Sequence, residues 1–278
     1  MIVQAIDTLD FATRIYMRMR SWVAPAGIAK TFLGFKMYCD TRDFIQRRIF
    51  YFGMFEPNLT YYMMSQLHAS DHVVDIGANV GYITLLVSHI VGDSGRVVSI
   101  EASPTTFALL SRNLKLNETS NVLALNMAAT GEPCEVEIVA GGSRNSGSNS
   151  IQRVTGRSAT VVKGDALSNL AAVDKERLKF IKIDIEGSET PVLQDILNNL
   201  HRYPKLRNIA VEMSPASANL VPLFVAAGFR VYALPNNYSI GYLFVREYLR
   251  RSKEDGFVVK KPIDAYDASY TDYVFERA

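Results

Sequence analysis

A short stretch of sequence, residues 73–86, constrains the fold of this chain more than any other feature. Val73 and Val74 are β-branched residues typical of a buried strand, Gly77 and Gly81 mark a tight turn, and an apolar helical pattern follows. Glycine has no Cβ atom, so the backbone and a ligand can approach each other closely at such a turn. The free N–H groups at the start of the helix face whatever lies over the turn. The stretch therefore predicts a strand–turn–helix unit that binds a ligand.

A second predicted strand, residues 96–100, ends in Glu101, and a carboxylate at that place can accept both hydroxyl groups of a ribose. A dinucleotide site normally contains three glycines, G-x-G-x-x-G, so that a pyrophosphate can lie on the backbone. Here Asn79 takes the place of the middle glycine, which argues against NAD and FAD. S-adenosylmethionine carries no phosphate, and it needs a close backbone approach and a carboxylate for its ribose. The two strands therefore predict a site for S-adenosylmethionine.

Composition is that of an ordinary soluble protein and gives no support to nucleic-acid binding. The 278 residues are 48% hydrophobic and carry a net charge of +2, without a long basic block. Cys39 and Cys134 form no CxxC pair, so we expect neither a metal knuckle nor a disulfide framework, and we expect a cytoplasmic setting. No segment contains the roughly 20 apolar residues of a membrane-spanning helix. Asp7 and Asp10 interrupt the apolar core that a signal peptide needs.

Strands and helices are predicted to alternate along most of the chain. Short apolar runs bounded by turn residues predict strands, and runs with apolar residues three and four apart predict helices between them. We expect the seven main strands near residues 73–76, 96–100, 121–127, 180–184, 208–213, 229–234 and 273–277. This alternation predicts an α/β fold with a doubly wound, mostly parallel, seven-stranded Rossmann-like sheet.

Two regions depart from this alternation. Residues 135–139 and 158–162 predict antiparallel strands on either side of a linker of small and polar residues. Residues 1–55 are expected to form an N-terminal extension, made of helices and then of short strands over residues 31–55. Residues 56–278 are expected to form the main domain.

Three motifs, in this order and at this spacing, carry a resemblance to a known family. They are D-I-G-A-N-V-G at residues 75–81, E-A-S-P at residues 101–104 and I-D-I-E-G-S-E at residues 183–189. Together they resemble the FkbM-type family of S-adenosylmethionine-dependent methyltransferases, over about residues 50–212. The resemblance implies a class I methyltransferase fold over residues 56–278. It also implies O-methylation of a hydroxyl group on a sugar, a glycan or a secondary metabolite.

Three carboxylates, Asp184, Glu186 and Glu189, crowd the end of a central predicted strand, where open α/β sheets bind ligands. Closely placed carboxylates raise one another's pKa, which suits a general base. Methyl transfer to a hydroxyl group needs a base, since an alcohol is a poor nucleophile, and none of the four histidines falls at the carboxyl end of a predicted strand. We therefore expect Asp184 or Glu186 to act as the catalytic base. The alternative for Glu186 is that it stabilises the start of the following helix.

The remaining candidate residues follow from their positions at the turn and at the strand ends. The expected cofactor-binding residues are Asp75, Gly77, Ala78, Asn79, Gly81, Glu101, Ala102, Ser103 and Asn126. The expected substrate-binding residues are Ser148 and Asn149, in the polar linker, and Glu212, at the next strand end. The acids could also hold a divalent cation such as magnesium, but no two of them show a fixed ligand spacing, so no metal ligands are assigned.

Two other functions are open at this stage. A DNA or RNA methyltransferase on the same fold would normally show a basic stripe or an Asn/Asp-Pro-Pro-aromatic motif, and the sequence contains neither. The acidic residues at the strand ends argue against the second alternative, a non-catalytic nucleoside-binding module. We therefore expect a small-molecule or glycan acceptor and no nucleic-acid partner. The sequence specifies no oligomeric state.

Overall fold

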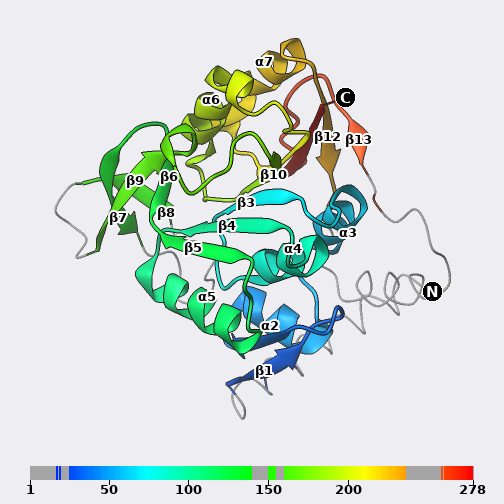
Figure 1. Cartoon of the computed structure of the whole chain (residues 1–278), viewed down its shortest axis with the longest axis vertical. Coiled ribbons are helices and arrows are strands. Elements are labelled where there is room, and N and C mark those ends of the chain that lie inside the picture. The colour runs from blue at the N-terminus through cyan, green and yellow to red at the C-terminus, as the bar shows by residue number, and fades with distance from the viewer. Residues whose placement is uncertain are drawn as a thin grey trace.

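One large sheet crosses the middle of the molecule (Figure 1). The computed structural model describes residues 17, 19, 25–139, 150–154, 160–235, 258 and 260–277, and eight strands of this sheet lie among them. In the order in which they lie side by side, the strands are β13 (Lys261–Pro262), β12 (Phe229–Leu234), β14 (Asp272–Arg277), β11 (Asn208–Glu212), β10 (Leu178–Ile183), β3 (His72–Ile76), β4 (Arg96–Glu101) and β5 (Val122–Asn126).

The directions of the strands confirm the fold class predicted from the sequence. Strands β11, β10, β3, β4 and β5 are parallel neighbours, and β14 lies antiparallel between β11 and β12. The two-residue strand β13 is added to the seven expected strands at one edge. The chain runs from β3 to β4 on one side, whereas β10 lies on the other side of β3, so the strand order reverses there. Open α/β sheets bind ligands at such a point.

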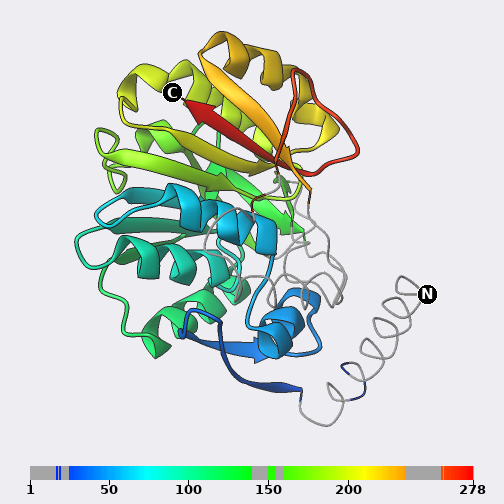
Figure 2. The ribbon, with the colours of Figure 1, turned by 90° about the vertical axis from the view of Figure 1, so that its right-hand side faces the viewer.

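Helices cover both faces of this sheet (Figures 1 and 2). They are α3 (Pro57–Gln66), α4 (Tyr82–Val91) and α5 (Pro104–Leu116) on one face and α6 (Glu189–Asn198) and α7 (Val221–Ala226) on the other, with the short 3-10 helices η2 (Leu167–Asn169), η3 (Leu200–Arg202) and η4 (Pro215–Leu220). Along β3, Val73 packs in the hydrophobic cluster of α3 and α4, and Val74 packs in that of α6 and α7. Burial on both faces explains why the parallel strands are almost continuous apolar runs.

The N-terminal part of the described chain forms a hairpin and a helix. Strands β1 (Ala26–Lys30) and β2 (Lys36–Asp40) pair antiparallel, and α2 (Phe44–Phe52) follows them. The expected short strands are therefore wrong for the residues of α2. Asp43 caps this helix by accepting the N–H of Gln46 at 2.9 Å, and Gly53, with φ 67°, follows its last residue. These two terminal signals favour a helix over the strand that the aromatic run suggested.

A second, smaller sheet follows β5 in the chain. Its strand order is β6 (Ala128–Thr130), β9 (Val161–Ala166), β7 (Cys134–Val139) and β8 (Ser150–Arg153). Strands β7 and β9 form an antiparallel pair, as the sequence predicted, but β8 was not expected and begins at the last residue of the predicted linker. Residues 140–149 and 155–159, like most of residues 1–24, lie outside the described residues. None of the described helices is long and apolar enough to span a membrane.

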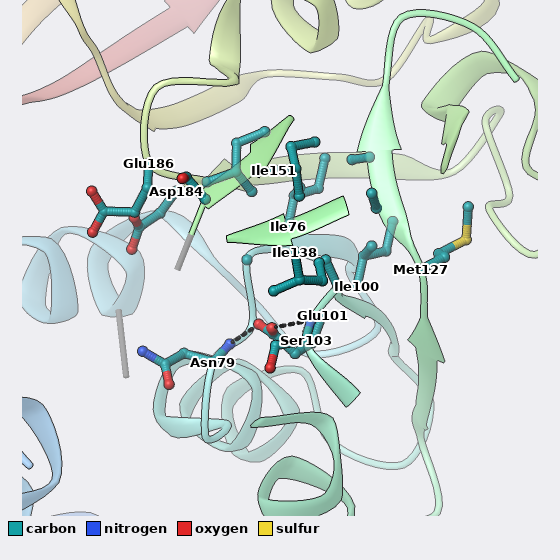
Figure 3. A pocket seen from close by; sticks show the side chains of 16 residues that line it. Ile76, Asn79, Ile100, Glu101, Ser103, Met127, Ile138, Ile151, Asp184 and Glu186 are labelled. Carbon is teal, nitrogen blue, oxygen red and sulfur yellow. Dashed lines mark hydrogen bonds between the residues drawn. The ribbon is translucent and has the colours of Figure 1, made fainter. Parts of the chain in front are cut away.

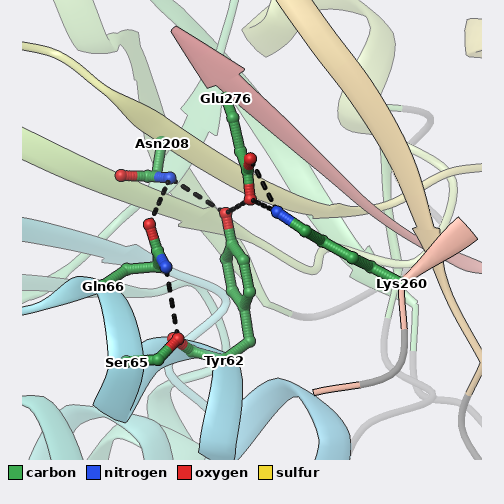
Figure 4. Close-up of polar contacts among 6 residues, drawn as sticks. All are labelled: Tyr62, Ser65, Gln66, Asn208, Lys260 and Glu276. Carbon is green, nitrogen blue, oxygen red and sulfur yellow. Dashed lines mark hydrogen bonds and ion pairs between the residues drawn. The ribbon is translucent and has the colours of Figure 1, made fainter. Parts of the chain in front are cut away.

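A polar network connects α3 to the main sheet at the amino ends of the parallel strands (Figure 4). The hydroxyl group of Tyr62 donates to Glu276 at 2.9 Å and accepts from the side-chain amide of Asn208 at 2.9 Å. Lys260 lies 2.6 and 2.8 Å from the two oxygens of Glu276. Burial, followed by the charge of Glu276, raises the pKa of Tyr62. Because Tyr62 is only 1% exposed, its hydroxyl group requires these partners.

The turn after β3 packs against the end of β10 so closely that Gly77 cannot carry a side chain. A Cβ atom on Gly77 would lie 1.7 Å from the backbone carbonyl oxygen of Asp184, and Gly77 also has φ 74°. We expect Gly77→Ala to lower the free energy of unfolding by about 3 kcal/mol or more. Gly228→Ala, at φ 91° with open space around it, should cost only about 1–2 kcal/mol. Urea denaturation of both variants checks this, and equal losses would contradict it.

Candidate functional site

A cavity lies at the carboxyl ends of β3, β4 and β10, beside the point where the strand order reverses (Figure 3). Its lining comes from the turn after β3 (Ile76, Gly77 and Asn79), the end of β4 and the next residues (Ile100, Glu101, Ala102 and Ser103), the start of β6 (Met127, Ala128 and Ala129), strands β7 and β8 (Ile138, Ser150 and Ile151) and the end of β10 (Asp184, Ile185 and Glu186). All three sequence motifs therefore line one cavity, together with strands of the smaller sheet.

The glycine turn has three residues in the left-handed region: Gly77 at φ 74°, Asn79 at φ 49° and Gly81 at φ 94°. The N–H groups of Gly77 and Ala78 donate to the carbonyl oxygen of Ile100 at 2.9 and 3.0 Å. A Cβ atom on Gly81 would lie 2.7 Å from the side chain of Leu110. The space at Gly77 and Gly81 is therefore filled by this chain itself. Internal packing therefore requires glycine at both positions.

Glu101 is the carboxylate that the turn holds in place. The N–H of Asn79 donates to one of its oxygens at 2.9 Å, and the N–H of Ser103 donates to the other at 2.9 Å (Figure 3). Burial raises the pKa of Glu101, and these two hydrogen bonds oppose that rise. Each carboxylate oxygen can accept two hydrogen bonds. A second acceptor position on each oxygen is therefore suited to the paired hydroxyl groups of a ribose.

The loop after β4 is fixed by two other predicted residues. The side-chain amide of Asn126 donates to the carbonyl oxygens of Glu101 and Ala102, both at 2.9 Å. Ser103 caps α5 by accepting the N–H of Thr106 at 3.4 Å. Ala102 and Ser103 line the cavity, whereas Asn126 supports the loop from outside the lining.

Asp75 lies inside the sheet and does not line the cavity. Its side chain is fully buried and accepts a hydrogen bond of 2.6 Å from the hydroxyl group of Thr84. Its other oxygen lies 3.7 Å from the ammonium group of Lys182. Burial raises the pKa of Asp75, and the charge of Lys182 and the hydroxyl of Thr84 oppose the rise. The structure thus places Asp75 among internal partners.

Lys182, to which the sequence gave no role, is the last residue but one of β10 and is only 4% exposed. Its ammonium group donates to the carbonyl oxygen of Gly77 at 3.0 Å and lies 3.2 Å from a carboxylate oxygen of Asp184. Burial alone would lower the pKa of Lys182, but the charges of Asp184, Asp75 and Glu56 outweigh burial and raise it. A lysine between Ile181 and Ile183, two residues before Asp184, was the signal that could have identified this residue.

Asp184 and Glu186 lie together at one end of the cavity (Figure 3). Glu186 is exposed at the rim, with φ 50°. Partial burial of its carboxyl group, followed by the charges of Asp184 and Glu189, raises the pKa of Glu186 to about 7. The carboxylate at the start of α6 is that of Glu189, which accepts the N–H of Gly187 at 2.7 Å. Glu189, and not Glu186, is therefore the carboxylate at the start of α6, which was the alternative role considered for Glu186.

Glu212 ends β11 and lines a smaller crevice of about 230 Å³, next to the cavity. Asp184 lines both spaces, and Glu56 and Asp272 also line the crevice. Burial, then the charge of Asp184 and a hydrogen bond with it, raises the pKa of Glu212 to about 10. These surroundings favour the protonated form of Glu212. The other two expected substrate residues, 148 and 149, lie outside the described residues.

Apolar side chains, which sequence analysis did not single out, form much of the cavity wall. They are Ile76, Ile100, Met127, Ile138, Ile151 and Ile185. Such a wall is suited to the flat ring of a nucleobase. None of the four histidines, all of which are described, lines the cavity. Among the described residues, no group of three or more His, Cys, Asp or Glu side chains could hold a metal ion.

The titration of Glu186 tests this arrangement of charges. We expect its carboxyl carbon to titrate near pH 7 by NMR. In Asp184→Asn the midpoint should fall, because loss of the neighbouring negative charge favours the ionised form. Asp93→Asn, which removes a carboxylate that does not line the cavity, is the control and should leave it unchanged. A Glu186 midpoint near 4.5 in the unmodified protein would contradict the arrangement.

Comparison with known proteins places this site in a family. A family model described as the methyltransferase FkbM domain matches residues 75–234, which is more than half of the chain. None of the curated proteins matches. Similar solved structures include a SAM-dependent O-methyltransferase from Thermotoga maritima (14% identity, TM-score 0.45, covering 92% of this chain and 78% of that one). A precorrin-6y C5,15-methyltransferase from Geobacter metallireducens (13%, 0.40, 79% and 88%) and Aeropyrum pernix fibrillarin in complex with S-adenosyl-L-methionine (9%, 0.42, 76% and 68%) are also similar. On the family match, the chain belongs to the FkbM methyltransferase domain family and is a methyltransferase that uses S-adenosylmethionine.

Proposed function

We propose that this protein transfers a methyl group to a hydroxyl oxygen of a sugar, a glycan or a secondary metabolite. The observation that carries the proposal is the pair Asp184 and Glu186 at the open end of the cavity, where no histidine lies among the lining residues. An alcohol must lose its proton as it attacks, so an O-methyltransferase needs a base at that place. We assign this activity to the domain over residues 56–278.

The lining of the cavity fits S-adenosylmethionine, which supplies a methyl group on a positively charged sulfur when bound. Glu101 would accept the two ribose hydroxyls, since its oxygens are held by backbone N–H groups with acceptor positions remaining. The isoleucines and Met127 would surround the nucleobase. The side-chain oxygen of Asn79 is buried and has no hydrogen-bond partner within the described part of the chain. A bound polar group would satisfy it.

Asp184 is our candidate for the base, with Glu186 as the second candidate. Asp184 lies 3.2 Å from the ammonium group of Lys182, a neighbour that favours the charged form of a carboxylate. Glu186 has a pKa of about 7, which is also suited to proton transfer near neutral pH. Either carboxylate would take the hydroxyl proton, and both would hold the acceptor in position.

The charge of the cavity supports a neutral hydroxyl acceptor over a nucleic acid. Three carboxylates, Glu101, Asp184 and Glu186, line it, and the described lining contains no lysine or arginine. Nucleic-acid binding depends on lysine and arginine contacts to phosphates. Carboxylates accept hydrogen bonds from hydroxyl groups, and a polyol offers several of them.

The cofactor site is tested by ligand-induced stabilisation. S-adenosylhomocysteine at 100 times its dissociation constant should stabilise the protein by about 2.7 kcal/mol, which raises the melting temperature, and NAD should not.

We expect Glu101→Ala to weaken S-adenosylhomocysteine binding by about 1–3 kcal/mol, because the ribose hydroxyls lose a charged acceptor. Calorimetric titration measures the affinity, and the melting temperature of the ligand-free variant controls for loosening of the turn. An unchanged affinity of Glu101→Ala for S-adenosylhomocysteine would show that Glu101 does not bind the ribose.

The catalytic role of Asp184 is tested by separating binding from turnover. We expect Asp184→Asn to keep S-adenosylhomocysteine affinity within a few-fold and to lower turnover by about 10² to 10⁴, because Asn keeps the shape of Asp but is not basic. The release of S-adenosylhomocysteine measures turnover with a panel of glycosides, oligosaccharides, other alcohols and RNA. Glu186→Gln is the comparison variant. Normal turnover by Asp184→Asn would move the base elsewhere, and methylation of RNA alone would overturn the proposed acceptor class.

A further inference from the structure

Lys182 lies at the junction between the two halves of the site. It is the last residue but one of β10 and is paired in register with Asp75 of β3. Its ammonium group contacts three groups from different segments: the carbonyl oxygen of Gly77 at 3.0 Å, Asp184 at 3.2 Å and Asp75 at 3.7 Å. One contact therefore leads to the turn at the cofactor side, and another leads to the carboxylate at the acceptor side.

Stability alone gives a poor reason for a lysine at this position. The side chain of Lys182 is only 4% exposed, and Asp75 beside it is fully buried. Taking such charges out of water costs several kcal/mol per ion, and replacing a buried ion pair by apolar residues of similar volume is often neutral or stabilising. Perturbed charges of this kind gather at functional sites. The buried ammonium group thus points to a role in the reaction.

Asp184 is surrounded by acids, and Lys182 is the cation among them. Asp75 lies on β3, Glu101 ends β4, Glu186 and Glu189 follow β10, Glu212 ends β11, and Glu56 and Asp272 complete the adjoining crevice. Of the described residues that line the cavity or the crevice, Lys182 alone carries a positive charge. Its ammonium group lies 3.2 Å from the carboxylate of Asp184.

This asymmetry decides between two neighbouring carboxyl groups. Asp184 and Glu212 share a hydrogen bond, and two adjacent carboxylates resist being ionised together. An ammonium group 3.2 Å from one of the pair favours charge on that one. The position of Lys182 therefore favours negative charge on Asp184 over negative charge on Glu212.

We propose that Lys182 is a positioning residue for methyl transfer, which fixes Asp184 as the charged carboxylate at the acceptor side and ties it to the Gly77 turn at the cofactor side. This inference rests on the proposed function, in which Asp184 takes the proton of the acceptor hydroxyl group. Lys182 itself acts only through Asp184 and the turn. It lies behind the cavity wall and is absent from the residues that line the cavity.

The test is Lys182→Met, compared with Lys179→Met on the same strand. With the best hydroxyl acceptor from the panel, Lys182→Met should move the acidic limb of the pH–rate profile upward by about one unit or more, because the base has lost an adjacent opposite charge. Affinity for S-adenosylhomocysteine should also fall, since the Gly77 carbonyl loses its partner. Lys179→Met should change neither. An unmoved acidic limb in Lys182→Met would overturn the inference.

Two further variants separate this role from a structural one. In the Asp184→Asn background, Lys182→Met should add little further loss of turnover, because both changes act on one unit. A full additive loss would show that Lys182 does not act through Asp184. If Lys182→Met does not fold, the double variant Lys182→Met with Asp75→Asn takes its place, because it also removes the buried Asp75 carboxylate that has lost its neighbouring cation. The same pH–rate profile is then measured on the double variant. Normal turnover by Asp184→Asn would overturn the assignment of Asp184 as the base. Low turnover by Asp184→Asn, together with an unmoved acidic limb of the pH–rate profile in Lys182→Met, would overturn only the inference about Lys182.

Discussion

The buried ammonium group of Lys182 is the interaction on which the geometry of the site depends. It joins the turn after β3 to the end of β10 through Gly77 and Asp184, and it lies next to the fully buried Asp75. Without a cation there, a carbonyl oxygen and two carboxylates would face one another in the interior, which is costly. The absence of a side chain on Gly77 permits the same close packing, because its Cα atom lies against the backbone of Asp184.

The cavity next to Lys182 has two chemically different ends, one at Glu101 and one at Asp184 and Glu186. On the side of β4, Glu101 is held by two backbone N–H groups, and isoleucines from the main sheet and from β7 and β8 surround it. At the other end, the carboxyl groups of Asp184 and Glu186 line the cavity, and our proposal assigns this end to the acceptor. A methyltransferase needs both surfaces, because it must hold its methyl donor and its acceptor next to each other. The smaller sheet completes the first surface, which the main sheet alone does not enclose.

Much of the fold was predictable because its signals are local. The strands of the main sheet are apolar runs between turn residues. The region of α2 was misassigned because Phe50, Tyr51 and Phe52 are aromatic residues that favour a strand, while the helix is set by Asp43 and Gly53 at its ends. The glycines have a second reason, internal packing, that the sequence did not reveal. Gly77 and Gly81 are needed where the chain packs on itself, and a sequence does not reveal which segment fills the space.

The sequence by itself determined the strand–turn–helix unit, the carboxylate after the second strand and the acidic cluster after β10, because each depends on residues close together in the chain. Tertiary structure alone decided what those residues touch. The contact from Lys182 to the Gly77 carbonyl spans 105 positions, and the one from Tyr62 to Glu276 spans 214. The raised pKa of Glu212 and the isoleucine walls from β7 and β8 likewise depend on which strands become neighbours. Burial and charge act through space, so the chemistry of these groups is set only when the sheet has formed.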